Sequence, residues 1–219
     1  MKKKHILVIN SATSVLQVGI TANEADLAVK ENTDRFRHAE FIFPLIDGLC
    51  REAGLPRPVI EAIIVSIGPG SFTGLRVGLA SAKGLALSLG IPLVGVSLFE
   101  SIASRLFQAF GKTRVYIPSR RNEYYTALID SSDFDNRTIT VVTGKNPAPL
   151  LANTKHLAID CTPGPEMIGN LDFLDSRDFS LGLDDFLRAG IRKLDCAGGD
   201  DIAVLEPLYI QQFPAHIKK

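Results

Sequence analysis

Ser66-Ile67-Gly68-Pro69-Gly70-Ser71-Phe72-Thr73-Gly74-Leu75-Arg76-Val77-Gly78 is the stretch that decides the fold of this 219-residue chain. It follows the apolar run 62–65 and precedes a helix-forming segment that ends at Gly90. A strand, a glycine loop and a helix start, in this order, present backbone N–H groups and the positive end of a helix dipole to an anion. The glycines allow positive φ angles and close backbone approach. The stretch therefore predicts one strand–loop–helix unit of an α/β protein.

Two interpretations of the glycine loop stand open. It is either a tight structural turn or a phosphate cradle, whose candidate residues are Gly68, Gly70, Ser71, Thr73 and Gly74. No Lys-Ser or Lys-Thr pair follows the last glycine, so the loop is not a Walker loop. Pro69 occupies the place of the first glycine of a nucleophile elbow, which excludes that motif around Ser71. We expect Thr73 to be the N-cap of the following helix.

Composition narrows the function classes. Lys plus Arg and Asp plus Glu number 24 each, and no long block of like charge occurs, which disfavours independent binding of nucleic acid. The three cysteines are widely spaced and form no C-x-x-C pair, which indicates reduced thiols rather than disulfides or a zinc site. The apolar run after the N-terminal lysines is short, and no stretch reaches membrane-spanning length. We therefore expect a cytoplasmic protein with no membrane segment.

Hydrophobic periodicity predicts alternating strands and helices in each half of the chain. The expected elements are strands at 5–10, 16–20, 27–29, 62–67 and 92–96 with helices at 39–52, 74–89 and 99–110, then strands at 114–117, 124–129, 138–142 and 156–160 and a helix at 183–194. Such a pattern is typical of an α/β protein with a mixed sheet in each half. We place the N-terminal lobe, with the glycine loop and both partner-binding helices, at 1–105 and the C-terminal lobe at 106–219.

Two of the predicted helices are apolar over more than one face. The helix at 39–52 carries a stripe of bulky residues, and the helix at 74–89 repeats small residues every four positions; these candidate interface residues are Phe41, Ile42, Leu45, Leu49, Gly74, Gly78 and Ala82. Such helices are deeply buried or shared with another chain. If the small residues form an interface, replacing Gly78 by Leu should block pairing and leave the chain folded.

The glycine segment, together with Ala82-Lys83-Gly84-Leu85-Ala86, resembles the signature of the TsaB (YeaZ) family. Three further stretches resemble that family: Ile6-Leu7-Val8-Ile9-Asn10-Ser11-Ala12-Thr13, Arg37-His38-Ala39-Glu40 and Pro207-Leu208-Tyr209-Ile210. The resemblance implies a two-lobed actin-like ATPase/sugar kinase (ASKHA) fold. It also implies a non-catalytic partner of TsaD in the synthesis of threonylcarbamoyladenosine on tRNA.

The resemblance implies several partners. TsaD would modify the adenosine next to the anticodon, the ATPase TsaE would join the pair, and TsaC would act upstream. The chain would meet tRNA only through the complex, and its helices at 39–52 and 74–89 would pair with TsaD or with a second copy in a homodimer. We expect residues 207–210 to be ordered and the chain to require no cofactor.

The resemblance also bears on catalysis. Asn10 stands where the superfamily usually carries an acidic magnesium ligand, and we expect it to form an Asx turn instead. Leu98 and Ile102 stand where TsaD carries two metal-binding histidines, so we expect no metal and no catalytic residue. Two alternatives remain: a nucleotide-binding phosphotransferase, for which the loop would bind nucleotide at least weakly, or a peptidase acting on TsaD.

Overall fold

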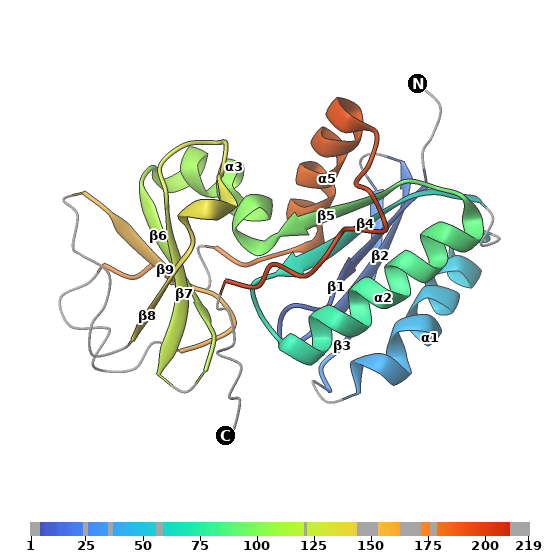
Figure 1. The fold of residues 1–219 in the computed structure, drawn as a ribbon, viewed down its shortest axis with the longest axis horizontal. Helices are drawn as coiled ribbons and strands as arrows, with labels where there is room; N and C mark the ends of the chain where they lie inside the picture. Colours follow the sequence, from blue (N-terminus) through green and yellow to red (C-terminus); the bar gives the residue numbers. More distant parts are fainter. Residues whose placement is uncertain are drawn as a thin grey trace, which may run out of the picture.

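The computed structural model describes residues 5–23, 26–34, 37–55, 59–120, 122–143, 153–162, 172–175 and 179–210. These residues form two sheets and four α-helices (Figure 1). In chain order the elements are β1 (His5–Asn10), β2 (Leu16–Asn23), β3 (Asp26–Asn32), α1 (His38–Glu52), β4 (Ile60–Gly68), α2 (Phe72–Leu89), β5 (Leu93–Ser97), α3 (Leu98–Phe110), β6 (Thr113–Pro118), β7 (Glu123–Ile129), a 3₁₀ turn (Asn136–Thr138), β8 (Thr140–Thr143), β9 (Lys155–Ala158) and α5 (Leu183–Ala197).

The first sheet has the strand order β3-β2-β1-β4-β5. β1 pairs antiparallel with β2 and parallel with β4, and β4 pairs parallel with β5. α1 and α2 cover one face of this sheet, while α5 packs on the other (Figure 1). The four central residues of β1 are apolar because both faces of the strand are buried: Ile6 and Val8 join the core on the α5 side, and Leu7 and Ile9 join the core on the α1 and α2 side.

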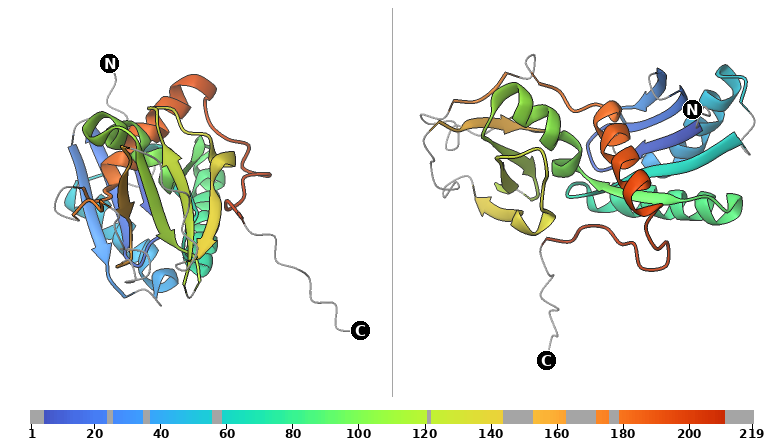
Figure 2. Two further views of the ribbon diagram at one scale, coloured as in Figure 1. Left: turned by 90° about the vertical axis from the view of Figure 1, so that its left-hand side faces the viewer. Right: turned by 90° about the horizontal axis from the view of Figure 1, so that it is seen from above.

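The second sheet has the order β8-β7-β6-β9. β6 pairs antiparallel with β7 and parallel with β9, so this sheet is also mixed. α3 leads from the first sheet into the second and packs against β6 and β7 (Figure 2). The predicted α/β fold with a mixed sheet in each half is confirmed.

The end of the chain returns to the first sheet. α5 packs on β5, β1 and β4, and a Cβ on Gly190 would lie 2.4 Å from Cδ1 of Ile64, so only glycine allows this approach. After α5, the Asp200 N–H donates to the Leu93 carbonyl at 2.8 Å. The predicted boundary after residue 105 places α5 in the C-terminal lobe. In the structure, α5 and the residues that follow it pack on the first sheet (Figures 1 and 2).

Within the described part of the chain, no helix combines the length and the apolar character needed to cross a bilayer.

Candidate functional site

The glycine loop joins β4 to α2 through a helix cap. The Ser71 hydroxyl accepts a hydrogen bond from the Gly74 N–H at 3.2 Å, which makes Ser71 the N-cap of α2. The prediction that Thr73 caps this helix is therefore wrong. α2 begins at Phe72, because the Ser71 side chain, three positions before Gly74, already accepts a hydrogen bond from an N–H group of the first turn.

The loop packs directly on the turn that follows β1. The Ser71 N–H donates to the Ala12 carbonyl at 2.7 Å. A Cβ on Gly70 would lie 2.1 Å from that same carbonyl oxygen, and a Cβ on Gly74 would lie 2.1 Å from the carbonyl oxygen of Ser11. Close packing of two turns thus explains these glycines without any ligand, as the structural interpretation of the loop expects.

A pocket of about 440 Å³ opens where the two sheets meet. Five segments line it: the turn after β1, the glycine loop with the start of α2, the end of β6 with its turn into β7, Asp160 after β9, and the chain's last described residues. The lining residues are Ala12, Thr13, Ser14, Gly70, Ser71, Phe72, Leu75, Ile117, Pro118, Ser119, Arg120, Tyr125, Asp160, Leu208, Tyr209 and Ile210. Of the five candidate cradle residues, Gly70 and Ser71 line this pocket, whereas Gly68, Thr73 and Gly74 do not.

Asn10 forms the predicted Asx turn. Its Oδ1 accepts from the Ala12 N–H at 3.1 Å, and its Nδ2 donates to Thr13 Oγ1 at 3.3 Å and Gln17 Oε1 at 3.1 Å. The side chain is fully buried and does not line the pocket. Its side-chain Oδ1 and Nδ2 both take part in holding the turn.

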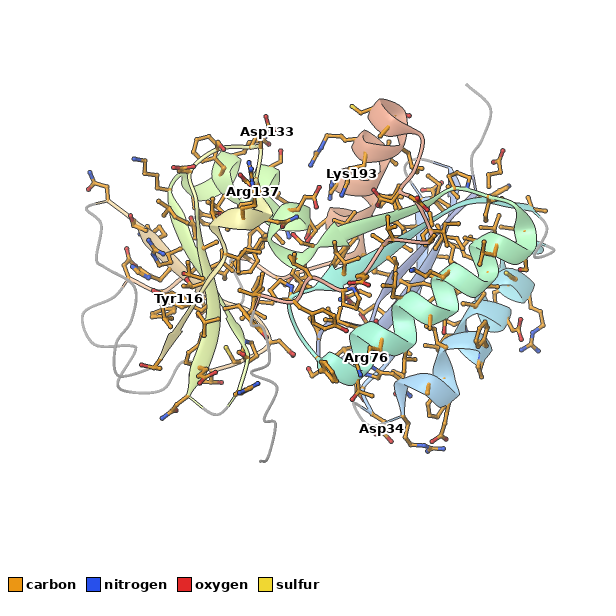
Figure 3. All side chains as sticks on the ribbon, in the orientation of Figure 1. Asp34, Arg76, Tyr116, Asp133, Arg137 and Lys193 are labelled. Carbon is orange, nitrogen blue, oxygen red and sulfur yellow. The ribbon has the colours of Figure 1, made fainter. Side chains whose placement is uncertain are left out.

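Residues 208–210 form one wall of the pocket. The Leu208 N–H donates to the Ile67 carbonyl at 2.7 Å, and the Tyr209 ring lies 6.0 Å from the Phe72 ring. Arg76, on the first turns of α2 (Figure 3), donates from Nε to the Tyr209 hydroxyl at 3.2 Å and places its guanidinium 3.8 Å above the Phe72 ring. Residues 207–210 are therefore ordered, as predicted. Residues 211–219 lie outside the described part.

Among the described residues that line the pocket, the side chains do not form an arrangement typical of metal or nucleophilic catalysis. Leu98 and Ile102 are fully buried in the core, and the described residues hold no cluster of His, Cys, Asp and Glu fit for a metal ion. The Ser71 hydroxyl is used as a cap, and no histidine lines the pocket. Burial, reinforced by the Asp160 carboxylate, raises the pKa of the neighbouring Cys161 to about 11, so this thiol is a poor nucleophile.

The structure places most of the predicted interface residues inside the chain. Ile42, Leu49 and Ala82 are core residues of the cluster between the helices and the first sheet, and Gly74 and Gly78 are also buried. A Cβ on Gly78 would lie 2.0 Å from Ser11 Oγ, so the small-residue strip accommodates the chain's own β1 turn. The strip therefore packs against the chain itself, and we now expect Gly78→Leu to disturb the fold as well as any pairing.

Other side chains face outward from α1 and α2. Phe41 and Leu45 are half-buried against the core, Phe43 is 40% exposed and Leu87 is 68% exposed. Ala80 and Gly84 are exposed on α2, and a Cβ on Gly84 would meet nothing within 4 Å. We refer to Phe43, Ala80, Gly84 and Leu87 as the outer helix surface.

The sequence of this chain is similar to those of several known proteins. The family model for TsaD, described as tRNA N6-adenosine threonylcarbamoyltransferase, matches residues 31–159. An uncharacterized protein of Mycobacterium tuberculosis is 34% identical over 151 residues, which cover 67% of this chain and 70% of that protein. The tRNA threonylcarbamoyladenosine biosynthesis protein TsaB of Escherichia coli is 35% identical over 129 residues, which cover 56% of this chain and 53% of TsaB.

Two solved structures from Pseudomonas aeruginosa share the fold. A protein described as similar to peptidase YeaZ superposes with a TM-score of 0.75 at 20% identity, covering 95% of this chain and all of that one. YeaZ itself superposes with a TM-score of 0.71 at 19% identity, covering 94% and 99%. The family model spans more than half of the chain, and the relatives include TsaB proteins of several bacteria. The chain belongs to the TsaB (YeaZ) family, within the wider TsaD family.

Proposed function

We propose that this chain is a non-catalytic accessory subunit for the synthesis of threonylcarbamoyladenosine on tRNA, in which it supports TsaD. The observation that carries the proposal is the burial of Leu98 and Ile102 at the positions where TsaD has metal-binding histidines. Apolar side chains cannot ligate a metal, and a fully packed core leaves no room for one. The names of the TsaB relatives supply the pathway.

The two alternatives find less support. A phosphotransferase of this superfamily needs a carboxylate near the phosphates, and the Asn10 side chain is instead committed to its own turn. A peptidase needs an activated nucleophile, and the Ser71 hydroxyl accepts from the Gly74 N–H with no histidine beside it in the pocket. TsaE and TsaC remain expected partners in the pathway, and tRNA is expected to contact the chain only within the complex.

The outer helix surface is the proposed contact with TsaD, or with a second copy when TsaD is absent. α1 and α2 lie side by side on one face of the first sheet, and both helices carry exposed residues on the side away from the core (Figure 1). Exposed Phe and Leu side chains next to the small residues Ala80 and Gly84 allow a partner helix to approach closely.

A matched pair of variants tests this contact. Leu87 and Val204 are 68% and 70% exposed, but Val204 lies on the segment after α5. A charge at Leu87 should be tolerated by the isolated chain and weaken pairing with TsaD about thirtyfold, the effect of a typical interface hot spot. Val204→Glu should pair like the unchanged chain.

Co-purification and analytical size exclusion with TsaD provide the measurement. If Leu87→Glu pairs as well as Val204→Glu while both remain folded by circular dichroism, the outer helix surface is not the contact. If the unchanged chain and TsaD never associate, the accessory role itself fails.

A further inference from the structure

A contact between the two sheets closes one side of the pocket. The Ser14 N–H donates to Oδ2 of Asp160 at 2.7 Å, and the Ser14 hydroxyl donates to Oδ1 of the same carboxylate. Ser14 belongs to the turn after β1, and Asp160 follows β9 of the second sheet, 146 residues later. One carboxylate thus accepts two hydrogen bonds from a turn in the opposite half of the molecule.

The backbone around Asp160 holds this carboxylate in place. The Ile159 N–H donates to the Tyr116 carbonyl at 2.9 Å, which fixes the preceding residue to β6, and Ile159 is itself buried. Asp160 has a φ of +59°, in the left-handed region that Asp and Asn tolerate better than most other residues. The orientation of the side chain therefore follows from ordered structure on both sides of the contact.

The contact between Ser14 and Asp160 lies where it can affect the binding of a ligand in the pocket. Ser14 and Asp160 both line the pocket, as do Gly70 and Ser71 of the glycine loop. A turn that offers an N–H and a hydroxyl to one point is suited to an anion, and charge-assisted hydrogen bonds of this type are about twice as strong as neutral ones. Here the chain's own carboxylate already accepts both hydrogen bonds.

We propose that Asp160 is a built-in anion that occupies the Ser14 turn, holds the two sheets together at the pocket, and keeps phosphate-bearing ligands out. A phosphate entering beside the turn would lose both Ser14 donors to Asp160 and would meet its negative charge. The weak nucleotide binding suggested by the glycine loop is then expected only after this carboxylate is neutralised. This contact is independent of the pairing surface on α1 and α2.

Asp160→Asn tests the proposal. Asparagine has the same shape and tolerates the same φ, so the backbone need not move. Asp172→Asn is the matched control, because Asp172 is also an exposed carboxylate near β9, pairs with Lys155, and does not line the pocket. Hydrogen exchange of the Ser14 amide should accelerate about tenfold or more in Asp160→Asn, as expected for loss of a hydrogen bond to a charged group, and should not change in Asp172→Asn.

Calorimetric titration with inorganic phosphate and with ATP at millimolar concentration gives the second readout. We expect saturable binding to Asp160→Asn and none to the unchanged chain or Asp172→Asn. Binding of both probes identifies a phosphate site, and binding of ATP alone identifies a nucleotide site. Unchanged Ser14 exchange, equal binding by unchanged chain and variant, or no binding by the variant would overturn the proposal. If Asp160→Asn fails to fold, Asp160→Gly also tolerates the positive φ, removes the carboxylate and leaves both Ser14 donors in place, so it should bind the probes in the same way.

Discussion

The packing of Gly78 makes a quantitative prediction about stability. An exposed Gly-to-Ala change inside a helix normally stabilises it by about 0.5–1 kcal/mol, because alanine loses less backbone freedom on folding. At Gly78 the added Cβ would lie 2.0 Å from Oγ and 2.9 Å from Cβ of Ser11, and Ser11 is fully buried. Rotation of the hydroxyl could relieve the first contact but not the second.

Gly78→Ala should therefore lower the free energy of unfolding by about 1–3 kcal/mol, the usual cost of overpacking a core. Gly84, on the same helix, is the control, because its Cβ would meet nothing within 4 Å. Gly84→Ala should raise the free energy of unfolding by up to about 1 kcal/mol. Adding Ser11→Ala to Gly78→Ala removes Oγ and should restore part of the lost stability.

Urea denaturation followed by circular dichroism measures all four proteins. Each kcal/mol should also move Tm by about 2–4 °C for a chain of this size. The reasoning fails if Gly78→Ala is as stable as Gly84→Ala, since the small-residue strip would then have room for a side chain and could face a partner after all.

Three further predictions concern side chains with unusual surroundings. Arg105→Met should lower the free energy of unfolding, measured with urea, by roughly 3 kcal/mol. The buried Asp185 carboxylate accepts two hydrogen bonds of 2.7 Å from Arg105, and the substitution leaves this charge without its partner. At pH 8 iodoacetamide should label Cys196, which is exposed, roughly ten times faster or more than Cys161, whose pKa burial raises to about 11; equal rates by peptide mass spectrometry would contradict this. Burial lowers the pKa of His156 below its ordinary value of 6.5. As pH drops from about 7 to 5, this histidine is therefore protonated more readily in the unfolded chain than in the folded one, and the free energy of unfolding should fall. His156→Gln should lose that part of the pH dependence.

The parts of the fold that follow local patterns could be predicted from the sequence. β1 and β4 each contain a run of four apolar residues, and the glycine loop between β4 and α2 has the composition that a tight turn requires. The Asx turn at Asn10 was also predictable, because its hydrogen bonds join residues close in sequence.

The parts that depend on distant contacts could not be predicted. The stripe of Gly74, Gly78 and Ala82 fits a partner helix and the chain's own β1 turn equally well, and only the three-dimensional packing decides between them. The return of α5 to the first sheet depends on Gly190 lying over Ile64, and no periodicity reports which sheet a helix will cover.

The pocket could not be predicted from the sequence for the same reason. Its walls come from five separate segments, and one of them, at Asp160, carries no sequence motif. Arg76 and Tyr209 both belong to stretches that resemble the family, yet their hydrogen bond spans 133 residues and could not be predicted from either stretch.

Reconstituted transfer of threonylcarbamoyl to tRNA is the most direct test of the central claim. TsaD, TsaE and TsaC would be assayed with and without this chain, and this chain would be assayed with TsaE and TsaC in the absence of TsaD. A non-catalytic accessory subunit predicts strong stimulation in the first comparison and no product in the second. Equal product with and without this chain, or product formed without TsaD, would contradict the account.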